Sequence, residues 1–122
     1  MTFTDAVRYA LQNYAVFTGR AGRSTFWYWV LFTVIVGIIA NVIDKSLGVS
    51  VIGSLVSLGF LLPNIGMAVR RLHDIGKSWK WLLLVLIPVL GWIYLIYLYV
   101  QPSEGPNVYG TGPATAPTTA GA

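Results

Sequence analysis

The chain has 122 residues, of which 56% are hydrophobic and only 10% are charged. Soluble domains carry about 25% charged residues, so this composition excludes an ordinary water-exposed domain and makes lipid the expected surroundings. The absence of cysteine excludes disulfides, iron–sulfur clusters and thiol catalysis. The net charge of +4 lies beside apolar runs, where the expected partner is the layer of anionic phospholipid headgroups and not a nucleic acid.

Residues 1–18 are predicted to form an amphipathic helix. Thr2 is the expected N-cap, with Asp5 three residues later as in a capping box. Such a helix either lies on the membrane surface or packs against the rest of the bundle. The aromatic-rich stripe and the two arginines that follow, Arg20 and Arg23, favour the surface. The stripe consists of Phe3, Val7, Ala10, Leu11, Tyr14 and Phe17.

Three apolar runs follow, at residues 26–43, 51–69 and 81–100, and each is long enough to cross a bilayer as one helix. No Lys, Arg, Asp or Glu lies inside any of them. Aromatic residues gather near the ends of the first and third runs, as they do at the headgroup level of membranes. The predicted fold is an all-α membrane protein, with three transmembrane helices preceded by an N-terminal amphipathic surface helix.

The second run carries a polar face. Ser54, Ser57 and Asn64 fall on one side of the predicted helix. Small and polar residues on one face are typical of helix–helix contacts in lipid. The alternative is a path for a substrate or an ion, with a kink at Pro63 as its gate. We favour the contact, because no ionisable residue lies within the run.

A dense charged segment, residues 70–78, separates the second and third runs. Charge of this density is excluded from hydrocarbon, which predicts a loop at a membrane surface. With three spans, every Lys and Arg except Lys45 would lie on the side of this loop. The positive-inside rule then makes that side cytoplasmic, with the N-terminus inside and the C-terminus outside the cell. The charged and titratable members of the segment are Arg70, Arg71, His73, Asp74 and Lys77.

His73 and Asp74 are the pair best suited to acid–base or metal chemistry. A metal site needs three or four ligands, whereas the chain has one histidine and no cysteine. A membrane enzyme acting on lipid headgroups would need a nucleophile such as Ser78 within reach. We favour a structural role, in which Asp74 is the counter-ion of neighbouring arginines. We expect no metal, no cofactor and no enzymatic activity.

Short motifs occur in order between residues 17 and 110. They are Gly19-Arg20-x-x-Arg23 followed by Phe26-Trp27, the segment Arg70-Arg71-Leu72-His73-Asp74-Ile75-Gly76-Lys77-Ser78, then Ile87-Pro88-x-x-Gly91, and finally Pro106-Asn107-x-Tyr109-Gly110. Together they resemble the DUF805 family of small bacterial inner-membrane proteins, and the Arg-Arg-Leu-His-Asp motif is the specific one. The resemblance implies a multi-span inner-membrane protein whose biochemical role is not established.

These observations divide the chain into an interfacial helix (residues 1–18), a three-span domain (residues 19–110) and a disordered tail (residues 111–122). The favoured function is a structural or regulatory helical bundle with a basic cytoplasmic face. It would pack as a homo-oligomer or with another membrane protein. The alternative is a subunit of a transporter or channel. We also expect Arg20 or Arg23 to pair with Asp74, so that the N-terminal segment docks onto the charged loop.

Overall fold

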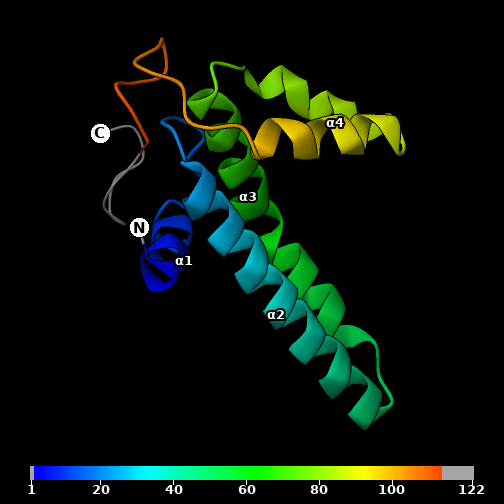
Figure 1. Ribbon diagram of the computed structural model, residues 1–122. Coiled ribbons are helices and arrows are strands. Elements are labelled where there is room, and N and C mark those ends of the chain that lie inside the picture. Colours follow the sequence, from blue (N-terminus) through cyan, green and yellow to red (C-terminus); the bar gives the residue numbers. More distant parts are fainter. Residues whose placement is uncertain (1, 114–122) are drawn as a thin grey trace.

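The computed structural model describes residues 2–113, and these residues form an all-helical chain. The all-α prediction is therefore confirmed for the part of the chain that the structure describes. Most of the tail predicted to be disordered, residues 114–122, lies outside the described residues. The elements are α1 (Phe3–Gln12), α2 (Arg23–Leu47), α3 (Val51–Asp74), the 3-10 helix η1 (Trp79–Leu86) and α4 (Leu90–Tyr99) (Figure 1).

Helices α2 and α3 form a long antiparallel hairpin that runs the length of the molecule (Figure 1). The chain turns between them because Gly48 takes a left-handed conformation, with φ at 69°. Asp44 then caps α3. Its carboxylate oxygens accept hydrogen bonds from the N–H groups of Ile52 (2.9 Å) and Gly53 (2.8 Å), donors that the first turn of a helix leaves without partners.

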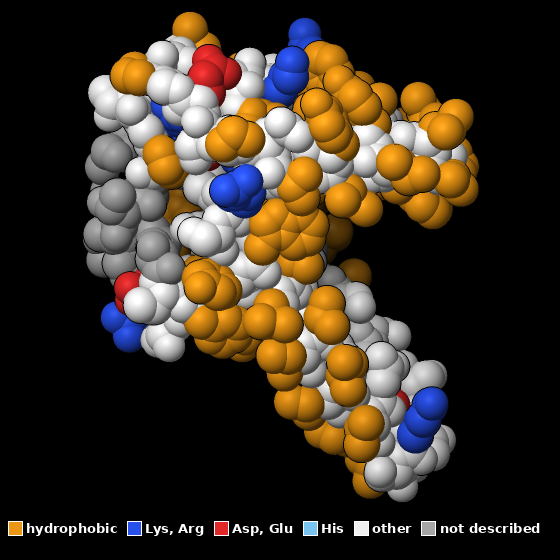
Figure 2. Space-filling model, viewed as in Figure 1, with side chains coloured by type: hydrophobic (Ala, Val, Ile, Leu, Met, Phe, Trp, Pro, Cys, Tyr) orange, Lys and Arg blue, Asp and Glu red, His pale blue; other side chains and the backbone are white. Residues whose placement is uncertain are grey.

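The outer surface of α2 and α3 is apolar and exposed. Both helices are long and apolar enough to cross a membrane. In each helix, only 17% of the residues in an apolar stretch of 18 residues are buried inside the chain. A core helix of a soluble protein would be mostly buried. Ile38 and Leu58 are instead 59% and 69% exposed, and Figure 2 shows orange side chains along one flank of the α2–α3 hairpin. The two helices are therefore candidate membrane spans, with lipid as the solvent of their outer faces.

Helix α1 packs against α2 and α3. Its buried face is centred on Tyr9, together with Ala6 and Ala10. Leu11, a member of the predicted apolar stripe, is 45% exposed. The two alanines allow the backbone of α1 to approach its neighbours closely, so the larger apolar side chains of the stripe are turned partly outward. The helix thus packs on the bundle with a face next to the one that the periodicity suggested.

The two ends of α1 are set by polar side chains. Thr2 is the N-cap, as predicted, because its Oγ1 accepts a hydrogen bond from the N–H of Asp5 at 3.2 Å. At the other end Asn13 donates from its side chain to the carbonyl of Tyr9 at 2.8 Å. The helix therefore ends at Gln12, earlier than the residue 18 that we expected.

The third apolar run does not form the single spanning helix that we predicted. It forms two antiparallel helices, η1 and α4, joined by a tight turn (Figure 1). Pro88 has no N–H to continue a helix, and Val89 takes a positive φ of 66°. Gly91 then lets the arms meet, since a Cβ built there would lie 1.9 Å from the carbonyl oxygen of Leu84. In the described chain, two helices and not three are long enough to span a bilayer.

The antiparallel pair of η1 and α4 returns the chain to the end of α3, so the C-terminal segment starts near the point where η1 starts. The N–H of Glu104 donates to the carbonyl of Asp74, at the end of α3, at 2.8 Å. Residues 101–113 therefore lie at the same end of the α2–α3 hairpin as the charged segment. The prediction of three spans placed them at the opposite end, and it is wrong on this point because the third run turns back at Pro88.

Candidate functional site

A cluster of charged side chains is buried where α1, α3 and the C-terminal segment meet. It consists of Arg20, Arg70, Arg71 and Asp74, each no more than 1% exposed, and we call these four residues the arginine cluster. We expected residues 70–78 to form a surface loop. Residues 70–74 are instead the last turn of α3, and only the residues after them form the connection to η1.

Asp74 lies at the centre of the arginine cluster. One of its carboxylate oxygens pairs with Nε of Arg20 and the other with Nη1 of Arg71, both at 3.0 Å, and all three side chains are fully buried. Ser103 also donates its hydroxyl to this carboxylate. Of the two partners that we considered for Asp74, the structure pairs Arg20. Arg23 remains exposed and donates to the carbonyl of Val100 at 3.1 Å.

Backbone carbonyls bind the remaining guanidinium donors of Arg20 and Arg71. Arg20 donates to the carbonyls of Gly105 (3.0 Å), Gly110 (2.9 Å) and Glu104. Arg71 donates to the carbonyls of Tyr99 (3.1 Å) and Gln101. Buried charges are stable only when they are paired or hydrogen-bonded. One carboxylate cannot neutralise both arginines, so backbone carbonyls of the C-terminal segment supply the other acceptors. These hydrogen bonds hold the C-terminal segment against the end of α3.

Arg70 binds the segment that follows α1. Its Nη1 donates to the carbonyls of Asn13 (3.1 Å) and Val16, and its guanidinium carbon lies 4.9 Å from the centre of the Tyr9 ring. The ring face attracts the cation. Burial raises the pKa of the Tyr9 phenol, and the nearby Arg70 cation opposes this shift. Arg70 therefore fastens the segment that follows α1, as Arg20 and Arg71 fasten the C-terminal segment.

His73 is held by backbone and ring contacts. Its Nδ1 lies 2.9 Å from the carbonyl oxygen of Gly19, so this nitrogen carries the proton and donates. The ring stacks on Tyr109, with the ring centres 4.0 Å apart and the planes 3° from parallel. Asn107 donates from its side chain to the backbone carbonyl of His73 at 3.1 Å. Through these contacts His73 links the segment before α2 to the C-terminal segment.

The chemistry available at this site is limited by how its groups are used. Both carboxylate oxygens of Asp74 accept hydrogen bonds from cationic or hydroxyl donors of the same chain. Among residues 2–113, no three His, Asp or Glu side chains come together as a set of metal ligands. The arrangement is suited to holding chain segments together, and the Ser103 hydroxyl shares the Asp74 carboxylate with Arg20 and Arg71.

The structure gathers most, but not all, of the predicted charge cluster. Arg20, Arg70, Arg71, His73 and Asp74 come together, whereas Arg23 and Lys77 lie at its edge. The ammonium of Lys77 lies 4.7 Å from the centre of the Trp81 ring.

Sequence reasoning missed three residues of the site, Ser103, Asn107 and Tyr109. Two of them belong to the Pro-Asn-x-Tyr-Gly motif, which was visible in the sequence. We had assigned that motif to the other side of the membrane.

The polar residues predicted to share one face of the second span lie in two different places. Asn64 accepts a hydrogen bond from Nε1 of Trp29 at 2.8 Å, which joins α3 to α2. Ser54 donates to the carbonyl of Ser50, one turn earlier in its own helix, at 3.1 Å. Ser54 and Ser57 line a surface groove of about 550 Å³, and Asn64 does not line it. The three residues therefore do not form one continuous path.

Comparison with known proteins places the chain in a family. The model of the family described as "Protein of unknown function (DUF805)" matches residues 14–111. The inner membrane protein YhaI of Escherichia coli K12 is 40% identical over 106 residues, which cover 84% of this chain and 90% of YhaI. The inner membrane protein YhaH of the same organism is 33% identical over 114 residues, or 88% of this chain and 94% of YhaH. No solved structure matches the chain. The chain belongs to the DUF805 family.

Proposed function

We propose that this protein is a structural component of the bacterial inner membrane, in which α2 and α3 span the bilayer and the arginine cluster fastens the terminal segments at one face. The observation that carries the proposal is the use of the buried arginines. Arg20, Arg70 and Arg71 donate to carbonyls or to Asp74 of the same chain. The exposed apolar surface of the two long helices and the names of YhaI and YhaH support the inner membrane as the location.

The arginine cluster lies at the cytoplasmic face in this proposal. Lys45 is at the far end of the α2–α3 hairpin, and the cations at the near end outnumber it. Because bases are retained on the cytoplasmic side, this asymmetry sets the orientation. Both the segment before α2 and residues 101–113 then lie inside the cell. The near-end cations outside the buried cluster, which would attract anionic headgroups by about 1 kcal/mol each, are Arg8, Arg23, Lys77 and Lys80.

Self-association is the mode of action that the surface favours. The groove between α2 and α3 is lined by Gly37, Asn41, Gly53, Ser54 and Ser57, and the polar side chains among them are exposed. Small residues let a second helix approach closely, and small and polar residues together are typical of helix–helix contacts in lipid. We infer that this groove is the contact between copies of the chain, and we assign the protein no enzymatic activity.

Crosslinking in native membranes tests the proposal. The protein should be recovered as dimers or larger homo-oligomers, and Ser57→Phe should reduce their yield by blocking the groove. Leu55→Phe is the matched control, because Leu55 is 62% exposed on the same helix and does not line the groove. Recovery of monomers alone, or equal losses with both variants, would contradict self-association through this surface.

A transporter or channel subunit is the second candidate function, and the volume of the groove is the observation in its favour. A water-filled path would make a cysteine at Ser57 reactive toward small polar thiol reagents applied from either side of the membrane. A contact between copies would protect the same cysteine in the oligomer. The two functions are therefore separated by one labelling experiment on Ser57→Cys.

A further inference from the structure

The η1–α4 hairpin projects away from the α2–α3 axis (Figure 1). No Lys, Arg, Asp or Glu occurs in residues 81–100. Leu86 and Leu90, on either side of the turn, are 74% and 73% exposed. Figure 2 shows orange side chains over much of this projection, with white atoms between them. An exposed apolar surface of this extent requires an apolar partner.

The backbone at the tip of the hairpin is largely satisfied by bonds within the hairpin. Pro88 has no N–H group, and the N–H of Leu90 donates back to the Pro88 carbonyl at 2.8 Å. Gly91 donates to Ile87 at 3.1 Å, and the indole N–H of Trp92 donates to the Val85 carbonyl at 2.8 Å. Donors without partners are costly in hydrocarbon, so this pattern suits a turn that lies among lipid chains.

Both ends of the hairpin lie at the end of α3 that carries the arginine cluster. The incoming end is fixed by Lys77, whose ammonium lies over the Trp81 ring. The outgoing end is fixed at the carbonyl of Tyr99, which accepts hydrogen bonds from Nε of Arg71 and from the indole of Trp27, each at 3.1 Å. A segment with both ends at one face enters and leaves the membrane on the same side.

The length of the hairpin matches one leaflet. η1 has 8 residues, or about 16 Å at the 3-10 rise of 2.0 Å per residue. α4 has 10 residues, or about 15 Å at the α-helical rise of 1.5 Å. The hydrocarbon core of a bilayer is about 30 Å thick. The hairpin therefore reaches no further than about the middle of the bilayer.

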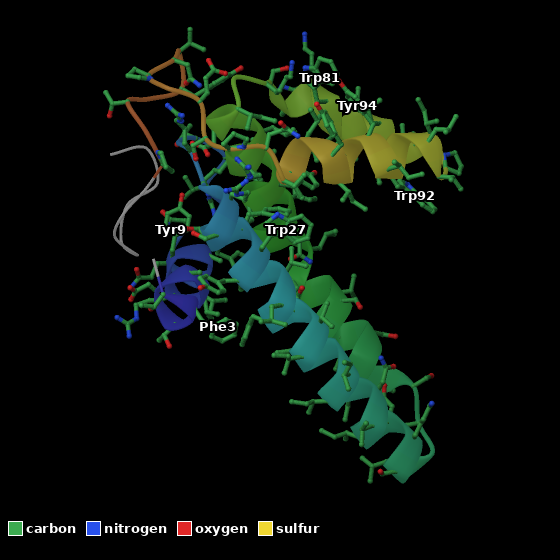
Figure 3. The ribbon with its side chains drawn as sticks, in the orientation of Figure 1. Phe3, Tyr9, Trp27, Trp81, Trp92 and Tyr94 are labelled. Carbon is green, nitrogen blue, oxygen red and sulfur yellow. The ribbon has the colours of Figure 1, made fainter. Side chains whose placement is uncertain are left out.

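We propose that the η1–α4 hairpin is a re-entrant element embedded in the cytoplasmic leaflet, with the acyl chains of that leaflet as its partner. The choice of leaflet rests on the proposed function, which places the arginine cluster at the cytoplasmic face. Trp92 and Tyr94, which lie on the hairpin (Figure 3) and are 48% and 41% exposed, are placed to contact these acyl chains. Because the hairpin occupies one leaflet only, it adds area to the inner half of the membrane and acts as a wedge.

Sided cysteine labelling tests the proposal, and the absence of native cysteine makes each single-cysteine variant clean. The variants are Lys80→Cys at the start of η1, Leu90→Cys at the tip of the hairpin and Val108→Cys after it, with Val49→Cys in the far turn as the orientation control. A membrane-impermeant maleimide is applied to intact spheroplasts and to inverted membrane vesicles. We expect Lys80→Cys and Val108→Cys to react only in inverted vesicles, Val49→Cys only in spheroplasts, and Leu90→Cys in neither until detergent is added.

Other labelling patterns overturn defined parts of the proposal. Reaction of Lys80→Cys and Val108→Cys from opposite sides would show that the run crosses the bilayer. Reaction of Leu90→Cys without detergent would place the tip in water. If Lys80→Cys and Val108→Cys both react in spheroplasts and Val49→Cys in inverted vesicles, the hairpin is re-entrant in the opposite leaflet. The orientation in the proposed function then fails, separately from the hairpin.

A distance measurement in native membranes gives an independent result. The rings of Trp81 and Tyr94 are 6.2 Å apart between centres, whereas thirteen residues of a continuous α-helix would separate them by about 20 Å. A short bismaleimide should therefore join the two thiols of the double variant Trp81→Cys/Tyr94→Cys within one chain. Two unlinked thiols that react fully with separate labels would contradict the hairpin.

Discussion

At the scale of single residues, Asp74 decides whether the two terminal segments stay docked. It is the only carboxylate bonded to buried arginines in the described chain, and it pairs with two of them. A buried ion pair is costly to assemble, but removing one partner is costlier because the other charge remains without compensation. The stability of the site should therefore respond far more to loss of Asp74 than to loss of an exposed acid nearby.

Asp74→Asn is predicted to destabilise the folded protein by about 3–5 kcal/mol, the usual range for breaking a buried pair. Thermal unfolding in detergent micelles or nanodiscs measures the change. Glu104→Gln is the control, since Glu104 is exposed and its carboxylate makes no ion pair in the described chain. A double-mutant cycle of Asp74→Asn with Arg20→Gln should give a coupling of about 1–3 kcal/mol. Additive effects would show that the pair contributes nothing.

Tyr9 predicts a pH dependence at alkaline pH. Burial raises the pKa of its phenol above the ordinary value of about 10. The folded state therefore favours the neutral phenol, and the stability this provides is fully present below about pH 10 and is lost as pH rises through the folded-state pKa. Hydrogen exchange in α1 should rise above pH 10, and Tyr9→Phe should reduce this rise relative to the Tyr14→Phe control. An equal rise in both variants would show that Tyr9 is not responsible.

At the scale of elements, periodicity and length predicted the helices, but turn chemistry decided where they end. Asp44, Gly48 and the Thr2 cap act locally, so their effects follow from short stretches of sequence. The third run was different, because an apolar run of that length fits one spanning helix as well as two short ones. Pro88 and Gly91 were visible, but a proline in a membrane helix often produces only a kink. The positive φ of Val89 has no signal in the sequence, since valine disfavours it.

Gly91→Ala is predicted to open or strain the hairpin, because the added Cβ would lie 1.9 Å from the Leu84 carbonyl oxygen. A backbone clash of this kind should lower stability by about 1–3 kcal/mol, measured as the unfolding temperature in nanodiscs. Gly59→Ala is the matched control in α3, where a new Cβ meets nothing within 4 Å. The control should leave stability unchanged or raise it, by up to about 1 kcal/mol. Equal effects of the two substitutions would argue against the close approach of η1 and α4.

At the scale of the whole molecule, the sequence indicated the helical class, the family and most members of the charged site. It did not indicate how the site is closed. Arg20, Arg71 and Asp74 were all visible, but their carbonyl acceptors in residues 99–110 have no residue signature, because every residue carries a carbonyl. The error in the third run then displaced the whole C-terminal segment. A single turn at Pro88 thus separates a three-span arrangement from one in which both terminal segments meet at the arginine cluster.

The side of the membrane on which the C-terminus lies is the most direct test of this arrangement. Two fusions to Ala122 measure it: green fluorescent protein, which folds in the cytoplasm, and alkaline phosphatase, which is active only after export. With residues 101–113 bound to a cytoplasmic arginine cluster, the first fusion should be fluorescent and the second inactive. An active phosphatase fusion together with a dark fluorescent-protein fusion would place the C-terminus outside and contradict a cytoplasmic arginine cluster that binds both terminal segments.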